Sequence, residues 1–266
     1  MQYDNAPFPA RRSRRLRTTK LVRDLVCENQ ITTNDLIWPV FVREGSGVTE
    51  PIKSLPGVFR YSIDLLVDEV QKISDLGIKC IAIFPCTPKH LKTTSCEEAW
   101  NENNLVNSAT IAVKKKNPSI LVMLDVALDP YNSMGHDGLV VNGKVVNDET
   151  LEALRKQSLA QAKSGADILG PSDMMDGRVS VIRDTLENNN FKNTLILSYS
   201  AKFASAFYGP FREAIGASGA LVGDKKSYQI NSANSAEALR DVASDIKEGA
   251  DMVMVKPGMP YLDVCR

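Results

Sequence analysis

The feature that most constrains this chain is the alternation of short, almost wholly apolar runs with longer stretches of helical periodicity. A strand buried on both faces is apolar throughout and is typical of a parallel sheet covered by helices. Strands are expected at residues 36–42, 78–85, 119–126, 165–170, 194–200 and 249–256. Helices are expected between them, at residues 62–77, 108–116, 149–164, 179–188 and 235–247. The pattern therefore predicts an α/β fold, and a chain of 266 residues suits a single (β/α)8-type TIM barrel.

Polar residues follow these apolar runs directly. Lys256 ends the last run before a Pro-Gly turn, Lys202 follows the fifth run, and carboxylates follow the third and fourth runs. The carboxyl ends of parallel strands meet at one face of a sheet or barrel, where such folds carry their functional groups. We therefore expect one site at this face. The glycine-rich phosphate-binding motifs of nucleotide-binding folds are absent from the sequence.

The two strand-end lysines predict amine chemistry. Lys256 alone has an ordinary explanation, because a lysine can pack its methylene groups on apolar neighbours and extend its ammonium into water. Neighbouring strands are about 4.8 Å apart, so Lys202 and Lys256 would share a pocket if the fifth and sixth strands are adjacent. Two close ammonium groups lower each other's pKa, and the neutral amine is the form that attacks a carbonyl. The pair favours two carbonyl substrates, whereas the alternative, a class I aldolase, needs only one such lysine.

A candidate anion site follows the fifth strand. Arg212 and Lys225 could hold a carboxylate, and Gln229 could add an amide contact. An ordinary solvent-exposed basic loop is the alternative, and the sequence leaves both open.

Charge and cysteine content narrow the class of partner. The 32 basic and 32 acidic residues cancel, which argues against nucleic acid or a membrane surface as the main partner. No apolar run has the length of a membrane span. The five cysteines lack Cys-x-x-Cys spacing and follow no secretory signal, which indicates reduced thiols in the cytoplasm. The expected partner is a small molecule.

The first 34 residues differ in composition from the rest of the chain. They contain a cluster of basic residues at Arg11, Arg12, Arg14, Arg15, Arg17 and Lys20. An arm that reaches a neighbouring subunit, a nucleic-acid tail and a solvated leader are all consistent with this cluster. We expect an N-terminal arm at residues 1–34 and one barrel domain at residues 35–266.

Six longer motifs follow one another between residues 125 and 261. They are Asp125-Val-Ala-Leu-Asp129-Pro-Tyr, Gly135-His-Asp-Gly138, Pro171-Ser-Asp-Met-Met-Asp-Gly-Arg178, Tyr199-Ser-Ala-Lys202, Tyr208-Gly-Pro-Phe-Arg212 and Met254-Val-Lys-Pro-Gly-Met-Pro-Tyr261. Together they resemble the delta-aminolevulinic acid dehydratase (porphobilinogen synthase) family. The resemblance implies a lyase that condenses two molecules of 5-aminolevulinate to porphobilinogen, with loss of two waters, in tetrapyrrole and heme biosynthesis. It also implies a β/α barrel with an N-terminal arm, assembled as a homo-octamer.

The resemblance gives roles to the residues already singled out. Lys256 and Lys202 would each form a Schiff base with the ketone of one substrate. Arg212 and Lys225 match positions that hold the carboxylate of the substrate on the Lys202 side, and Gln229 lies in the same loop.

Three further residues on the rim match active-site positions of the family. Asp125, Ser172 and Asp173 would order the lid or assist proton transfer. A proton-shuttling role for Asp125 is a hypothesis that comes from its place at the end of a strand.

The residues of the loop after the third strand indicate which metal the protein could bind. Zinc-type members have three cysteines in this loop, where this chain has Ala127, Asp129 and Asp137. Thiolates suit Zn²⁺ and carboxylates suit Mg²⁺, so the resemblance implies the magnesium-responsive branch without a catalytic zinc. An activating Mg²⁺ would bind at a subunit contact through Asp241, where the alternative is a solvated helix carboxylate. His136 is either a ligand or a hydrogen-bonded loop histidine.

The sequence departs from the family at its end. Family members continue for about two further β/α units, which supply the serine and tyrosine that bind the carboxylate of the second substrate. Six units are expected here, with an open, unpaired sheet edge. We therefore expect residues 1–266 alone to show little condensation activity, and an assembly-only fragment is the alternative from another class.

Overall fold

The chain consists of two units in the computed structural model, which describes residues 6–217 and 219–266. The contacts divide it into Met1–Asp35 and Leu36–Arg266. The elements of the first unit are the 3-10 turns η1 (Ser13–Arg17) and η2 (Thr33–Asp35) and the helix α1 (Lys20–Leu25). None of residues 6–35 is buried. The described part of the first unit therefore has no hydrophobic core of its own.

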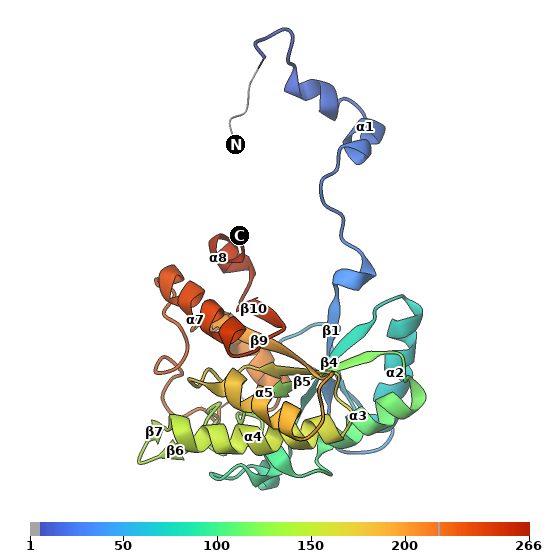
Figure 1. The fold of residues 1–266 in the computed structure, drawn as a ribbon. Helices are drawn as coiled ribbons and strands as arrows, with labels where there is room; N and C mark the ends of the chain where they lie inside the picture. Colours follow the sequence, from blue (N-terminus) through green and yellow to red (C-terminus); the bar gives the residue numbers. More distant parts are fainter. Residues whose placement is uncertain (1–5, 218) are drawn as a thin grey trace. The chain divides into compact units, whose positions relative to one another are not determined.

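The second unit is built on one parallel sheet. Its main strands are β1 (Ile37–Val42), β4 (Cys80–Pro85), β5 (Leu121–Val126), β8 (Ile168–Pro171), β9 (Leu195–Lys202) and β10 (Met252–Lys256). Each expected apolar run forms one of these strands, and strands that follow one another in this series are hydrogen-bonded neighbours (Figure 1). The register of β9 and β10 sets Lys202 opposite Lys256. The expected parallel sheet and the adjacency of its fifth and sixth strands are confirmed.

Two short strands extend the sheet beyond β1. β3 (Phe59–Tyr61) pairs in parallel with β1, and β2 (Thr49–Pro51) pairs antiparallel with β3. The sequence predicts a polar, glycine-containing loop at residues 44–51, and the three residues of β2 are too few for a periodic pattern to indicate a strand. A cross-strand ion pair of 2.7 Å between Arg60 and Glu50 joins them instead of an apolar contact.

Helices lie between consecutive strands and cover the outside of the sheet (Figure 1). They are α2 (Ile63–Asp75), α3 (Leu105–Lys116), α4 (Asn147–Lys163), α5 (Arg178–Asn188) and α7 (Ser235–Lys247). Helix α3 begins three residues before its expected start because the Asn104 side chain accepts a 2.8 Å hydrogen bond from the backbone of Asn107. The remaining elements are β6 (Val140–Val141), β7 (Lys144–Val145), α6 (Gly209–Ala214), α8 (Leu262–Cys265) and the 3-10 turns η3 (Lys89–Leu91), η4 (Glu97–Trp100), η5 (Ala206–Tyr208) and η6 (Met259–Tyr261).

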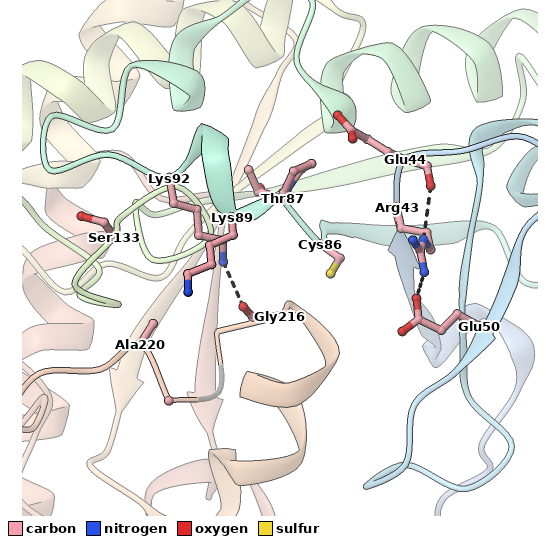
Figure 2. Close-up of a pocket in the computed structure, with 12 residues that line it drawn as sticks. Arg43, Glu44, Glu50, Cys86, Thr87, Lys89, Lys92, Ser133, Gly216 and Ala220 are labelled. Atoms are coloured by element: carbon pink, nitrogen blue, oxygen red, sulfur yellow. Dashed lines mark hydrogen bonds and ion pairs between the residues drawn. The ribbon is translucent and has the colours of Figure 1, made fainter.

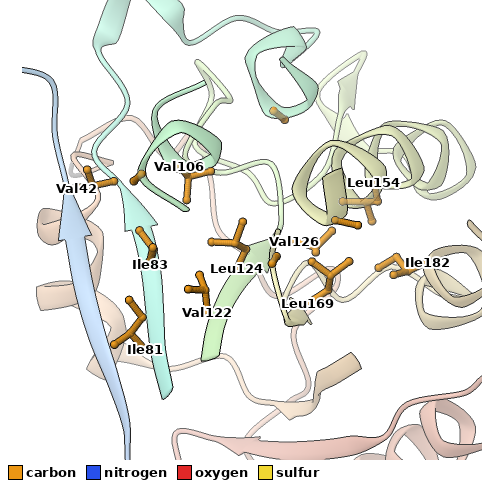
Figure 3. Close-up of a cluster of buried hydrophobic side chains, with 14 of the residues drawn as sticks. Val42, Ile81, Ile83, Val106, Val122, Leu124, Val126, Leu154, Leu169 and Ile182 are labelled. Atoms are coloured by element: carbon orange, nitrogen blue, oxygen red, sulfur yellow. The ribbon is translucent and has the colours of Figure 1, made fainter. Parts of the chain in front are cut away.

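The strands bury both of their faces, as their apolar runs predict. On β4, Ile81 and Ile83 pack toward the helices, whereas Ala82 and Phe84 belong to a separate cluster on the other face. Figure 3 draws the outer cluster, which includes Val106 of α3, Leu154 of α4 and Ile182 of α5. This double burial fixes the register of every central strand, and with it the residues at the carboxyl ends.

Over the described residues the strand order is linear, with β10 at one edge of the sheet and β2 at the other. The carboxyl ends of the six main strands meet at one face. The predicted lysines Lys202 and Lys256 end β9 and β10 and so lie at that face.

Candidate active site

A small cavity lies at the carboxyl ends of the parallel strands. Its volume is about 30 Å³, roughly the share of one water molecule in the liquid. Seven of the predicted site residues line it: Asp125, Ser172, Lys202, Arg212, Lys225, Gln229 and Lys256. Two do not, since Asp173 is buried against Arg178 and Asp241 lies on α7. The structure therefore brings the predicted lysine pair and the predicted anion-binding residues to one place.

Lys256 lies in an aromatic setting. Its Nζ is 4.8 Å from the ring centroids of both Tyr199 and Phe211. Burial lowers the pKa of Lys256 to about 8, and the charge of Lys202 adds to the effect. With that pKa, about a tenth of the amines are neutral at pH 7, far more than for an ordinary lysine. The direction agrees with the expectation from the sequence.

Lys202 lies opposite Lys256 in an ionic setting. Its Nζ donates to Asp137 Oδ1 at 3.1 Å and to the backbone carbonyl of Ser172. Only 7% of the residue is exposed. A carboxylate and a carbonyl both stabilise the ammonium form, so the two lysines face different electrostatic conditions.

Lys225 forms ion pairs with two buried carboxylates, Asp137 at 2.6 Å and Asp129 at 3.3 Å. Burial alone would raise the pKa of Asp137, but the charges of Lys202 and then Lys225 lower it below its ordinary range. Burial would lower the pKa of Lys225, but Asp129 and Asp137 raise it. Sequence reasoning placed both aspartates in the loop after β5 but named neither as a site residue. The position of both aspartates in one loop after β5 was the signal that could have identified them as site residues. Their ion pairs with Lys225 depend on how the loops fold against each other.

Asp125 lies at the end of β5 with its Oδ1 unpartnered among the described residues. Burial raises the pKa of Asp125 to about 6, and the charge of Asp129 adds to the effect. A carboxyl group that titrates near neutrality can take up a proton and return it.

Asp173 is buried beside Arg178 and does not line the cavity. Burial raises its pKa to about 7, and the Arg178 guanidinium, 3.6 Å away, opposes that shift. The carboxylate accepts a 2.7 Å hydrogen bond from the backbone of Met175. In this structure Asp173 therefore shapes the loop after β8 and does not line the cavity.

Arg212 of α6 lines the cavity without an ion pair or side-chain hydrogen bond to any described residue. Gln229 lines the same cavity and is 7% exposed. A guanidinium without a partner can bind a carboxylate in a bidentate manner without first breaking another bond.

A second hollow, of about 820 Å³, opens at the ends of β1 and β4. In Figure 2, Lys92 donates to the carbonyl of Gly216 at 3.1 Å, and Arg43 pairs with Glu50. Burial lowers the pKa of Lys92. The segment at Gly216 therefore forms one wall of this hollow and is held there by a partly buried amine.

A third hollow, of about 600 Å³, contains the predicted metal residue. Asp241 lines it together with Asp176, Glu237, Asp245 and Glu248. Burial raises the pKa of Asp241, and the charges of Glu237 and Asp245 add to the effect. Oxygen donors of this kind suit a hard divalent cation. Within residues 6–217 and 219–266, no three His, Cys, Asp or Glu side chains are arranged to hold a metal together. A Mg²⁺ ion in this hollow would therefore have few protein ligands and would keep several waters.

Known proteins share both the sequence and the fold. The family model for delta-aminolevulinic acid dehydratase matches residues 10–266. The enzyme of Rhodobacter capsulatus is 56% identical over 98% of this chain and 78% of its own length. That of Bradyrhizobium diazoefficiens is 54% identical over 96% of this chain and 72% of its own length. The crystal structure of the Toxoplasma gondii enzyme in complex with the reaction product porphobilinogen has a TM-score of 0.93 at 48% identity, and the match covers 96% of this chain and 72% of that one.

These similarities establish the fold class and the activity. The α/β fold with a barrel-like parallel sheet is confirmed, and the activity is that of porphobilinogen synthase, a hydro-lyase of tetrapyrrole biosynthesis that acts on 5-aminolevulinate. The family uses metal ions, and its members include chloroplastic enzymes of plants. No helix in the described part of the chain is both long and apolar enough to cross a membrane. The chain belongs to the delta-aminolevulinic acid dehydratase family.

Proposed function

We propose that Lys256 and Lys202 each form a Schiff base with one 5-aminolevulinate, and that the two bound substrates condense to porphobilinogen. The β9–β10 register, which sets these lysines opposite each other, carries the proposal. In each Schiff base a neutral amine attacks the ketone carbon, and the ketone oxygen leaves as water. Both lysines are released as amines when the pyrrole ring closes, so the net loss is two waters. A single-lysine aldolase mechanism would leave one of the paired amines without a role.

Lys202 must lose a proton before it can attack. Asp125 lines the same cavity, and the charge of Lys202 acts on its carboxyl group. With a pKa of about 6, Asp125 is suited to accept that proton and return it in a later step.

Arg212, Lys225 and Gln229 hold the carboxylate of the substrate on the Lys202 side in this proposal. Arg212 is available without rearrangement, whereas Lys225 has to exchange at least one aspartate for the incoming carboxylate. Ser172 supports the site through its backbone carbonyl, which accepts from Lys202.

Substrate binding requires the cavity to open. About 30 Å³ holds about one water molecule, and two substrates need several times that space. Arg212 and Lys225 both line the cavity, so displacement of their side chains would open the site.

Mg²⁺ is the metal that fits this chain. Asp241 and the neighbouring carboxylates would hold it at a subunit contact, with waters completing its shell, and it would stabilise the assembly there. A catalytic zinc does not fit, because Ala127, Asp129 and Asp137 offer no thiolate and the two aspartates are already paired with Lys202 and Lys225. We expect Mg²⁺ to activate the enzyme and Asp241→Asn to abolish that response. Asp184→Asn, an exposed helix carboxylate, is the matched control, and an unchanged Mg²⁺ response in Asp241→Asn would exclude the site.

The arm is proposed to mediate assembly into a homo-octamer in the cytoplasm. It exposes large apolar side chains at Phe8, Leu16, Leu21, Leu25 and Ile31, and none of its described residues is buried. Such residues need a partner surface. Deletion of residues 1–34 should reduce the mass measured by light scattering, and an unchanged mass would contradict this role.

Borohydride trapping tests the Schiff bases. Incubation with 5-aminolevulinate and borohydride, followed by peptide mass spectrometry, should show reduced adducts on both Lys202 and Lys256. An adduct on one lysine only would contradict the two-amine proposal. Lys89, which is exposed and lines the second hollow, is the internal control for non-specific labelling.

A further inference from the structure

Residues 219–223, named the strap here, pack directly on the loop after β5. The backbone N–H of Val222 donates to the carbonyl of Met134 at 3.2 Å. Gly135 has a φ of +72°, and a Cβ at this position would lie 2.9 Å from the backbone nitrogen of Leu221. Only glycine permits this approach. The strap therefore rests on the loop that carries the active-site aspartates.

His136 joins the strap to one of those aspartates. Its Nε2 is 2.8 Å from the carbonyl oxygen of Val222, and its Nδ1 is 3.0 Å from the hydroxyl of Tyr228. Tyr228 donates to Asp137 Oδ2 at 2.8 Å, and Lys202 donates to Asp137 Oδ1 at 3.1 Å. One chain of hydrogen bonds thus runs from the strap to a proposed Schiff-base lysine. Both ring nitrogens are engaged, so His136 fits the hydrogen-bonded histidine rather than a metal ligand.

The donors and acceptors assign a role to each member of this chain. The Val222 carbonyl can only accept, so His136 Nε2 carries a proton. Tyr228 has a single proton and donates it to Asp137 Oδ2, and its hydroxyl oxygen lies 3.0 Å from His136 Nδ1, so the hydroxyl links the ring to the carboxylate. His136 is 7% exposed and Asp137 is 1% exposed, so water does not easily replace either contact.

Asp137 needs this support because its other partners take part in the reaction. Lys202 leaves the ion pair when it becomes an imine, and Lys225 is drawn toward the substrate carboxylate. Among the described side chains that contact the Asp137 carboxylate, Tyr228 is the one that is not a proposed substrate-binding residue. It can keep the carboxylate in place throughout the cycle.

We propose that His136 is a positioning residue that holds the strap on the loop after β5 and, through Tyr228, keeps Asp137 oriented toward Lys202. The effect on Lys202 rests on the proposed Schiff-base function. The attachment of the strap follows from the contacts of His136 alone.

Hydrogen exchange of the intact protein tests the attachment. His136→Ala should raise the exchange rate of the strap about tenfold, because a buried hydrogen bond is lost. His136→Gln should restore protection to within about threefold, since its amide can donate to the Val222 carbonyl. His90→Gln, at the exposed second histidine, is the matched control and should change nothing. Wild-type exchange of the strap in His136→Ala would overturn the proposal.

Tyr228→Phe separates the two halves of the proposal. It keeps the bond between His136 and Val222 but removes the junction to Asp137. Strap exchange should stay at the wild-type rate, while kcat falls about tenfold and KM changes little. An unchanged kcat would overturn the link to Lys202. The borohydride experiment tests the proposed function independently, since missing adducts in the wild type would leave the exchange results intact.

Discussion

Lys256 and Lys202 occupy paired positions on adjacent strands, yet their surroundings differ in kind. Lys256 is packed among aromatic rings, and burial lowers its pKa to about 8. Lys202 is held by the carboxylate of Asp137 and a backbone carbonyl. One site thus combines a lysine whose pKa is lowered by burial with a lysine held in an ion pair. We expect this difference to set an order, in which Lys256 attacks first and Lys202 follows after losing a proton.

Removing either amine should have the largest effect. Lys256→Ala and Lys202→Ala should each lower kcat at least about 10³-fold, because each removes a covalent attachment point. Their trapping patterns should differ, however. Lys202→Ala should still form a borohydride-reducible adduct on Lys256, detected by mass spectrometry, and its absence would break the proposed order.

Removing the Arg212 guanidinium should affect one substrate only. Arg212→Met should lower kcat/KM about 10²-fold, because a charge-assisted, bidentate contact to a carboxylate is lost. Adduct formation on Lys256 should keep its wild-type rate. Slower trapping on Lys256 in this variant would show that Arg212 does not belong to the Lys202 side.

The two lysines should also have opposite effects on stability. Lys256→Met should raise the free energy of unfolding by about 2 kcal/mol at pH 7, because a buried ammonium is replaced by an apolar chain of similar size. Lys202→Met should lower it by about 2 kcal/mol, because buried Asp137 loses a cation. Urea denaturation measures both changes in the free energy of unfolding. Changes of the same sign would contradict the proposed difference between the surroundings of the two lysines.

Replacing the proposed proton acceptor should have a smaller effect. Asp125→Asn should lower kcat and kcat/KM equally, by about tenfold, because it removes a group that helps Lys202 lose its proton. Steady-state kinetics provide the test. An unchanged rate would remove Asp125 from the mechanism.

The pH dependence of stability gives the finest test. The pKa of Lys256 is about 8 in the folded protein and about 10.5 when unfolded, so the unfolded state binds more protons between these values. The contribution of Lys256 to the free energy of unfolding therefore rises as the pH increases from about 8 to about 10.5. The advantage of Lys256→Met should shrink from pH 8 to 10 in urea denaturation, and a constant advantage would contradict the lowered pKa.

The strands and the lysine pair could be predicted from the sequence because both depend on local pattern. An apolar run followed by lysine fixes a strand and its end, and parallel topology then brings Lys202 and Lys256 together. The same reasoning correctly placed Asp125 at the end of β5.

Contacts that depend on how loops close could not be predicted in this way. The ion pairs of Lys225 with Asp129 and Asp137 join segments about 90 residues apart, and no periodicity encodes that distance. Asp173 follows Ser172 directly but is turned toward Arg178, away from the cavity. The ion pair between Arg60 and Glu50, which joins β3 to β2, was also missed, because strands of three residues show no clear periodicity.

The most direct test of the central contrast is a time-resolved version of the trapping experiment. The protein is mixed with 5-aminolevulinate at pH 7, quenched with borohydride at successive times, and digested for mass spectrometry. The account predicts that the adduct on Lys256 forms first and that the adduct on Lys202 follows. Accumulation on Lys202 first, or equal rates at both lysines, would contradict it.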